Sequence, residues 1–147
     1  MKKQALTAIA VTILLTLVAA VKTSAQSVNQ RLVADIPFSF TVANETLPAG
    51  TYTVTVVNPA SDQKVIRISS IDGKRNAMVR MMPVVAAEKA DSHLVFRRYG
   101  EHHFLAQAWT SGDVYGMEAR KTKTERSIGK DLASNGQQIE TLALKRR

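Results

Sequence analysis

The chain has 147 residues, of which 45% are hydrophobic and 22% are charged, and it contains no cysteine. Its length suits one domain, and an apolar fraction of this size is ordinary for a globular core, which argues against a disordered chain. Without cysteine, the fold owes nothing to disulfides or thiolate metal sites, and no lipid can be attached through a cysteine.

The first 25 residues have the three parts of a secretory signal peptide. Two lysines open the chain after the initiating methionine, and an uncharged apolar run follows from residue 5 to residue 21. Small residues offer two cleavage sites, one after Ala20 and one after Ala25. The apolar run of 17 residues is shorter than the ~20 that a spanning helix needs. That length does not exclude an anchor, but the small residues at the cleavage sites favour cleavage. We therefore expect a cleaved signal peptide and a periplasmic or extracellular protein.

The formal net charge of +8 is unevenly distributed. Residues 1–25 carry three lysines and no acidic residue, which leaves +5 on the rest of the chain. Residues 118–147 hold eight basic and four acidic side chains, so they account for +4, and residues 26–117 account for only +1. This division predicts a signal peptide over residues 1–25, a β domain over residues 26–117 and a basic arm over residues 118–147.

Alternating polarity predicts the strands at the start of the β domain. A short strand over residues 31–35 leads through Pro37 into a strand from Ile36 to Val42, and a second alternating stretch runs from Thr51 to Val57. Between them, Leu47-Pro48-Ala49-Gly50 has the residues of a reversing turn. We therefore expect these two alternating strands to pair as a hairpin.

Two further hairpins are predicted. Asp72-Gly73 suits a two-residue type I′ turn between a strand from Lys64 to Ile71 and a strand from Lys74 to Met82, which Pro83 closes. Residues 84–92 are expected to form a loop. Gly100-Glu101 suits a type II′ turn between a strand that begins at His93 and its partner from Phe104 to Thr110.

The C-terminal region is more polar. Residues 117–134 contain only three large apolar side chains, which favours a solvated helix or an extended arm, and the stretch from Gln138 to Leu144 has the alternation of a last strand. About seven or eight short strands with turns roughly every ten residues are typical of an antiparallel sandwich or small barrel. The predicted fold class is therefore all-β: a small antiparallel β-sandwich, or a partly open barrel, with a basic C-terminal arm.

Three segments together carry a family resemblance: IPFSFTVANETLPAGTYTV, HLVFRRYG and FLAQAW, which lie within residues 35–110. They resemble a family of small secreted proteins of soil bacteria. These proteins pair an IPF-x-F-x-V strand with an LPAG-x-Y strand and carry an RYG turn and a later tryptophan. The resemblance implies export and a β fold, and it brings no activity, cofactor or catalytic residue onto this chain.

The hairpin from Arg97 to His103 holds the candidate ligand contacts. With its predicted turn, Tyr99 lies opposite His102, and Arg97 shares their face of the sheet. Guanidinium and stacking contacts from these three residues would suit an anionic or sugar-like ligand. The competing interpretation makes Tyr99 and Trp109 core or rim aromatics and the arginines solvated edge charges.

No residue set predicts a reaction, a metal site or a cofactor. His102 and His103 are consecutive, so on a strand they point to opposite faces, and His93 lies ~20 Å away. The sequence has no Gly-x-Ser-x-Gly elbow and no phosphate-cradling glycine loop. Acidic pairs such as Glu118 and Glu125 lie among basic residues, where a solvated face is the ordinary explanation.

These observations predict an exported, non-enzymatic protein that acts by interaction or as a structural component of the cell envelope or exterior. The alternative is a small-ligand binding protein or hydrolase that uses the hairpin from Arg97 to His103. The basic arm is expected to solubilise the protein, or to contact lipid headgroups or acidic polymer weakly and through charge alone. Nucleic acid is not an expected partner of an exported chain.

Overall fold

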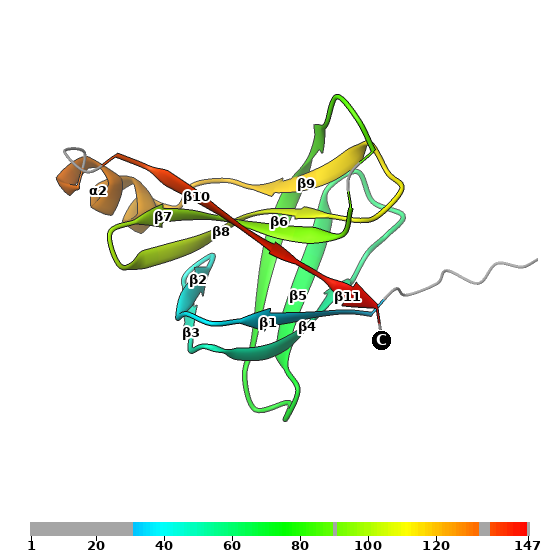
Figure 1. The fold of residues 1–147 in the computed structure, drawn as a ribbon, viewed down its shortest axis with the longest axis horizontal. Coiled ribbons are helices and arrows are strands. Elements are labelled where there is room, and N and C mark those ends of the chain that lie inside the picture. The colour runs from blue at the N-terminus through cyan, green and yellow to red at the C-terminus, as the bar shows by residue number, and fades with distance from the viewer. Residues whose placement is uncertain (1–30, 90, 133–135, 147) are drawn as a thin grey trace, which may run out of the picture.

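The computed structural model describes residues 31–89, 91–132 and 136–146 (Figure 1). The predicted signal peptide and both cleavage sites lie outside these residues. Within the described part of the chain, the strands form one mixed, largely antiparallel β-sheet, accompanied by one short helix, α2 (Lys123–Asp131). The prediction of a β-rich fold is therefore confirmed. No helix in these three described ranges is long and apolar enough to cross a membrane.

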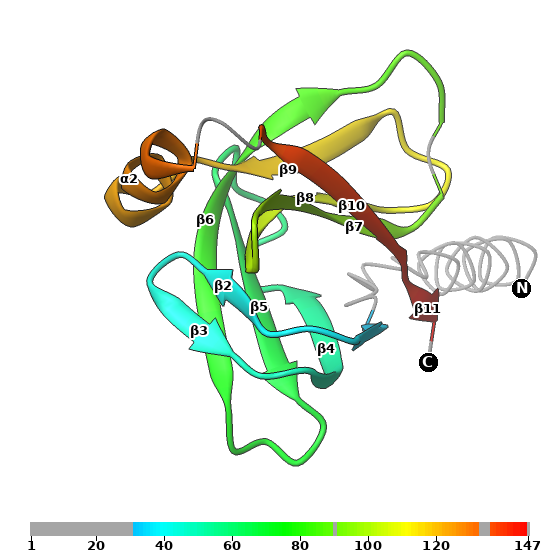
Figure 2. The same cartoon turned by 60° about the vertical axis from the view of Figure 1, so that its left-hand side comes forward.

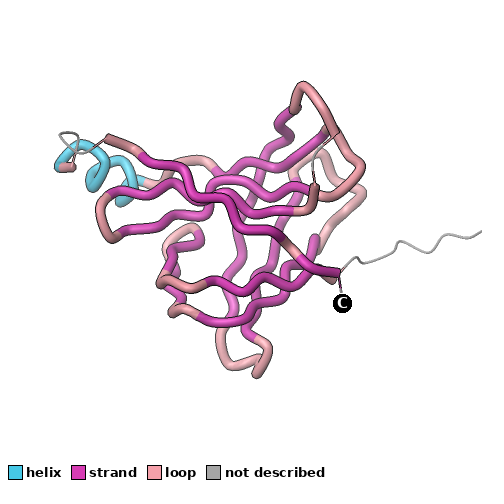
Figure 3. Tube along the Cα trace, viewed as in Figure 1, coloured by secondary structure: helices cyan, strands magenta, loops and turns pink. Residues whose placement is uncertain are grey.

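Strands follow one another along nearly the whole described chain, as the tube in Figure 3 shows. In chain order they are β1 (Leu32–Ile36), β2 (Phe40–Val42), β3 (Glu45–Leu47), β4 (Gly50–Val56), β5 (Lys64–Ser70), β6 (Asn76–Val85), β7 (His93–Tyr99), β8 (His102–Trp109), β9 (Tyr115–Ala119), β10 (Gln138–Ala143) and β11 (Lys145–Arg146). In the sheet their order is β10-β7-β8-β9-β6-β5-β4-β1-β11. The hairpin β2–β3 joins this order through a parallel contact of β2 with β8.

The C-terminal segment occupies both ends of this strand order (Figure 1). β10 pairs with β7 along its whole length, and after Leu144 the chain continues as β11, which pairs with β1. Leu142 and Leu144 pack against the main core. The predicted last strand is therefore confirmed, and the segment from residue 118 onward contributes part of β9, the helix and two strands to the folded body. The predicted boundary after residue 117 falls inside β9.

The first predicted hairpin is wrong. Pro37 follows the last residue of β1, and β4 pairs with β1 rather than with the stretch that contains Phe40. Phe40 belongs instead to the small hairpin β2–β3, where the chain reverses at Ala43 with a φ of 55°. The physical reason is that proline has no N–H for a ladder, so the alternating stretch is divided in two. The Leu47-Pro48-Ala49-Gly50 segment leads from β3 into β4.

The second predicted hairpin forms with a different turn. Gly73 has a φ of 71°, and it is the one residue of this turn with positive φ, whereas a type I′ turn needs two. The Gly73 N–H donates to Ser70 O at 2.9 Å, and the Ser70 N–H donates to Arg75 O at 2.9 Å, so the loop is longer than predicted. β6 also continues through Pro83. The sheet tolerates this proline because the pairing of β5 with β6 stops at Lys64 and Met81. Pro83 therefore has no strand on that side that would need its missing N–H.

The third hairpin forms in the predicted register. Tyr99 pairs with His102 and Arg98 pairs with His103, and Gly100 has the positive φ of 57° that the turn needs. A bulge between Val95 and Phe96 shifts the register farther from the turn. The prediction for this hairpin is confirmed.

The main hydrophobic core combines buried side chains from every strand from β1 to β9, and the sheet that carries them is curved rather than flat (Figure 2). Burying an aliphatic or aromatic side chain of this kind stabilises a fold by roughly 1.5–3 kcal/mol. A smaller cluster lies apart from the main core, where Val95, Ala106 and Trp109 pack with Val84 and Ala86. The largest fully buried apolar side chains of the main core are Tyr52, Phe40, Phe96, Ile36, Ile66, Ile68, Met81 and Leu94.

Gly116 packs directly against Trp109, and a Cβ atom at this position would lie 2.5 Å from two atoms of the indole ring. Gly116→Ala is therefore expected to lower the free energy of unfolding by about 1–3 kcal/mol, measured by urea denaturation. The same change in a Trp109→Leu background should cost less, because the smaller side chain leaves room. Equal losses in both backgrounds would contradict this packing.

Candidate functional site

A buried ion pair fastens α2 to the sheet. Arg97 on β7 donates from Nε to Glu125 Oε1 at 2.6 Å and from Nη2 to Glu125 Oε2 at 3.3 Å. Its Nη2 also donates to the carbonyl oxygen of Ala119 at 3.1 Å, at the end of β9. Arg97 is 5% exposed and Glu125 is 2% exposed. Because a buried charge without a partner is strongly destabilising, each of these two side chains requires the other.

The helix begins where it does because Thr122 caps it. The Thr122 hydroxyl accepts a hydrogen bond from the Glu125 N–H at 3.1 Å, and the Thr-x-x-Glu spacing is that of a capping box. In a complete capping box the glutamate side chain accepts a hydrogen bond from the backbone N–H of the capping residue. Here the Glu125 carboxylate accepts from Arg97 instead. Gly129 lets the helix approach the sheet closely, because a Cβ there would lie 3.1 Å from the Tyr99 ring. The Tyr99 hydroxyl lies 3.3 Å from Glu125 Oε1 and 3.0 Å from Gln137 Oε1.

The structure brings together two of the three predicted contact residues. Arg97 and Tyr99 meet at Glu125, whereas His102 is exposed and lines a different hollow. The interpretation of Tyr99 and Trp109 as core or rim aromatics is confirmed by their burial. The expectation of solvated charges is wrong for Arg97 and Glu125, because each is buried against the other. The sequence analysis missed the role of Glu125, and the one signal that could have marked it is its place three residues after Thr122, the spacing of a capping box.

The three histidines have separate surroundings. His103 is buried, its Nε2 lies 3.3 Å from Glu140 Oε2, and its ring stacks on Phe38 with centroids 3.9 Å apart. His93 stacks on Trp109 at the other end of the hairpin. His103 is therefore a buried residue of the hairpin, whereas His102 on the opposite face is exposed. Among the residues the structure describes, no group of three or more histidine, aspartate or glutamate side chains could hold a metal ion.

One hollow, here called the basic hollow, lies between α2 and β7. Its volume is about 400 Å³. Lys121 Nζ donates to Gln137 Oε1 at 2.8 Å and lies 5.5 Å from the centre of the Tyr99 ring. The exposed cations Arg126 and Lys130 have no ion-pair partner among the described residues. The lining residues are Tyr99, Lys121, Glu125, Arg126, Gly129, Lys130, Gly136 and Gln137.

This lining favours an anion. Glu125 is the one acidic residue of the lining, and both of its oxygens already accept hydrogen bonds from Arg97. The positive charges of Lys121, Arg126 and Lys130 are therefore not cancelled locally. A carboxylate, sulfate or phosphate group in this hollow would meet three cations, and Arg126 would offer the paired donors that suit such groups.

A second hollow, here called the hydroxyl hollow, lies on another side of α2 and has a volume of about 270 Å³. The hairpin β2–β3, the start of β8 and the helix enclose it. Its lining residues are Thr41, Ala43, Asn44, Thr46, His102, Phe104, Thr124 and Ile128. This lining contains no lysine, arginine or carboxylate, so its chemistry differs from that of the basic hollow.

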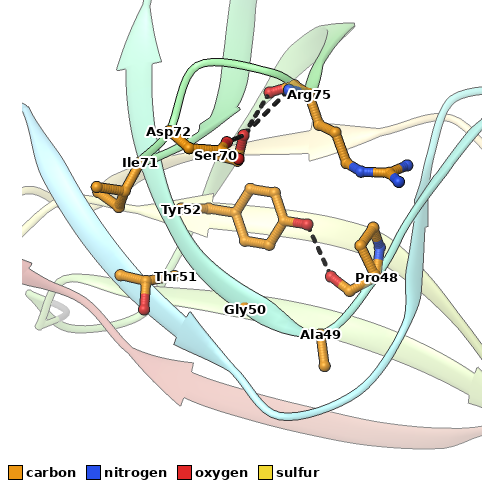
Figure 4. Close-up of a pocket in the computed structure, with 9 residues that line it drawn as sticks. All are labelled: Pro48, Ala49, Gly50, Thr51, Tyr52, Ser70, Ile71, Asp72 and Arg75. Carbon is orange, nitrogen blue, oxygen red and sulfur yellow. Dashed lines mark hydrogen bonds between the residues drawn. The ribbon is translucent and has the colours of Figure 1, made fainter.

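A third hollow of about 420 Å³ lies beside the turn between β5 and β6 (Figure 4). Its polar groups bond one another: the Tyr52 hydroxyl donates to Pro48 O at 2.7 Å, and the Ser70 hydroxyl donates to Asp72. Burial raises the pKa of Tyr52 above its ordinary value, although the nearby Arg75 opposes this. The Ser70 hydrogen bond, assisted by the Lys74 N–H, lowers the pKa of Asp72. These contacts lock the turn and leave few free groups for a ligand.

Comparison of the chain with protein-family models, curated proteins and solved structures finds no significant match. The function is therefore inferred from the charge and geometry of these hollows.

Removal of the Glu125 carboxylate should loosen the helix. Glu125→Ala leaves Arg97 buried without its partner, which is expected to cost about 3–5 kcal/mol in urea denaturation. The matched control is Glu118→Ala, because Glu118 Oε1 lies 3.7 Å from Arg97 Nη1 but its side chain is 46% exposed. The control should cost less than about 1 kcal/mol. Similar losses for the two variants would contradict a dominant buried pair.

The pKa of Asp72 is expected to rise in Ser70→Ala, because the hydroxyl that favours the carboxylate is gone. Folding lowers the pKa of Asp72, so its carboxylate stabilises the fold when the pH is above the pKa of the unfolded chain. This stabilisation is lost as the pH falls through the pKa of the folded state. Carbon-13 NMR titration of the Asp72 carboxyl group measures the change. Ser69→Ala is the control and should leave the titration as in the wild type; an unchanged midpoint in Ser70→Ala would contradict the assignment.

Proposed function

We propose that the protein is an exported, non-enzymatic β protein that binds an anionic component of the cell envelope or exterior through the basic hollow. One observation carries this proposal: Lys121, Arg126 and Lys130 line one hollow whose single carboxylate is already bonded to Arg97. Export is supported by the signal-peptide pattern of residues 1–25 and by the resemblance to secreted bacterial proteins.

Binding is favoured over catalysis because the buried polar groups are committed to one another. Arg97, Glu125 and Tyr99 have the side-chain types of a reactive centre, yet Arg97 and Glu125 form a closed pair and Tyr99 bonds to both Glu125 and Gln137. Their arrangement holds the helix in place. The exposed cations around it are suited to a partner that approaches from solvent.

The expected partner is a soluble or surface-attached polyanion rather than a lipid bilayer. Arg120 and Lys123, which are exposed and lie next to Lys121 and Thr122 in the chain, add positive charge near the hollow. Attraction of this kind weakens with salt. The large apolar residues of α2 and its C-terminal end, Ile128 and Leu132, are half-buried against the protein. The helix therefore lacks an exposed apolar stripe for entry into a membrane.

For the architecture, we infer a partly open barrel rather than the two-layered sandwich. All described strands belong to one sheet. Its two end strands, β10 and β11, follow one another in the chain and pair with β7 and with β1. One main core cluster contains residues from both halves of this order. These features support a sheet that curls around one main core.

The alternative of a small-ligand binding protein or hydrolase that uses Arg97, Tyr99 and His102 as one surface has less support. Arg97 lines none of the three hollows, and Tyr99 and His102 line different ones. A ligand in either hollow would contact only one of the three.

Neutralising the basic hollow should weaken polyanion binding. The triple variant Lys121→Gln/Arg126→Gln/Lys130→Gln removes three cations, each worth about 1 kcal/mol next to an anionic surface, so affinity should fall about 100-fold. Titration calorimetry with dextran sulfate and polygalacturonate at low and high salt measures this affinity. Neutral dextran is the control that shows whether binding requires a charged polymer.

The matched control is Arg67→Gln/Lys74→Gln/Arg80→Gln, which removes the same charge from exposed positions on β5, β6 and their turn. It should retain most of the affinity. Equal losses in the two triple variants would show attraction by net charge alone, and no binding by the wild type would overturn the proposed function.

A further inference from the structure

The hydroxyl hollow is formed by three parts of the chain that are far apart in sequence. Ala43 and Asn44 form the turn of the β2–β3 hairpin, His102 begins β8, and Thr124 and Ile128 lie four residues apart, on one side of α2. Ala43 holds a left-handed φ of 55°, which non-glycine residues seldom adopt and which is enriched at ligand sites. The helix is held against this hollow by the buried Arg97–Glu125 pair.

Five polar side chains line this hollow, and four of them, Asn44, Thr46, His102 and Thr124, are exposed to solvent. The Thr41 and Thr46 hydroxyls bond one another at 3.2 Å. Within the described part of the chain, the side chains of Asn44, His102 and Thr124 make no hydrogen bond. An amide, a hydroxyl and an imidazole together offer both donors and acceptors to a ligand.

The rest of the lining is apolar. Phe104, Ile128 and Ala43 supply carbon surface beside these polar groups. A ligand with hydroxyl groups on its edge and C–H groups on its face is complementary to such a lining. Because the lining holds no lysine, arginine or carboxylate, it gives no advantage to a charged ligand.

We propose that the hydroxyl hollow binds one uncharged sugar ring. Its volume of about 270 Å³ lies near the lower end of small-molecule sites, which suits a single ring rather than a larger ligand. Several hydroxyl groups on one small ring can pair with the donors and acceptors that Asn44, Thr124 and His102 offer. This inference goes beyond the proposed polyanion binding and does not depend on it, because the two hollows have different linings and charges.

Nitrogen-15 NMR of the exported chain, without residues 1–25, tests the inference with the methyl glycosides of glucose, galactose and N-acetylglucosamine as probes. At least one glycoside should cause saturable shifts of the amide signals of Asn44, Thr46, His102 and Thr124. The signals of Gly129 and Gln137, which line the basic hollow, should change little. Glycerol, which has hydroxyl groups but no ring, serves as the control probe and should cause no saturable shift.

Two substitutions test the polar contacts. Asn44→Ala and Thr124→Val should each weaken glycoside binding about tenfold, because the first removes a carboxamide and the second replaces a hydroxyl by a methyl group of similar size. Asn76→Ala and Thr141→Val are the matched controls, since both wild-type residues are exposed and lie outside this hollow. The controls should bind as the wild type does.

Two results would overturn the proposal: no saturable shift with any of the three glycosides, or saturable shifts that map to residues outside the hydroxyl hollow. The shift map of the wild-type protein decides this even if a variant fails to fold. Glycoside shifts that persist in the Lys121, Arg126 and Lys130 triple variant would show that the two sites act separately. The proposed polyanion binding therefore succeeds or fails independently of this site.

Discussion

The buried ion pair of Arg97 and Glu125 fastens the short helix α2 to the sheet. The helix that carries Glu125 has nine residues, which is too short to be stable alone in water. It forms because Thr122 caps its first turn, because Glu125 reaches a buried guanidinium, and because Gly129 admits the Tyr99 ring. Without Glu125, the buried Arg97 guanidinium would keep only the Ala119 carbonyl and the half-exposed Glu118 carboxylate near it.

The same pair produces the chemistry of the surface around the helix. By holding the helix in place, it positions Lys121, Arg126 and Lys130 around one hollow. The Glu125 carboxylate is bonded to Arg97 and so does not neutralise these cations. On another side of the helix it holds Thr124 opposite the β2–β3 hairpin, where the lining is uncharged. A single buried interaction therefore separates a cationic surface from a neutral, hydroxyl-bearing one.

The sequence predicts most of this fold where the decisive information is local. Gly100 fixed the turn and register of the third hairpin, because a glycine with positive φ at the first central position leaves few alternatives. The first hairpin was predicted wrongly because the turn-like residues before Gly50 concealed a smaller reversal at Ala43. β9 was missed because its glycine, Gly116, weakens the strand pattern, and only its contact with Trp109 explains that glycine.

The site was less predictable, because its residues acquire their roles through distant contacts. Arg97 and Glu125 are 28 positions apart, so a charge that looks solvated in sequence is buried in the fold. The capping-box spacing from Thr122 to Glu125 indicates a helix start, but no local pattern reveals which partner the carboxylate reaches. The two hollows likewise combine segments that only the tertiary structure brings together.

Hydrogen exchange of the Arg97 Nε–H group tests the central claim most directly, because this proton lies in the proposed bond to Glu125. Nitrogen-15 NMR at neutral pH should show a slowly exchanging signal with nuclear Overhauser contacts to α2. The exposed Arg67 and Arg80 provide rapidly exchanging references in the same spectrum. An Arg97 signal that exchanges as fast as theirs, with no contact to the helix, would contradict the account.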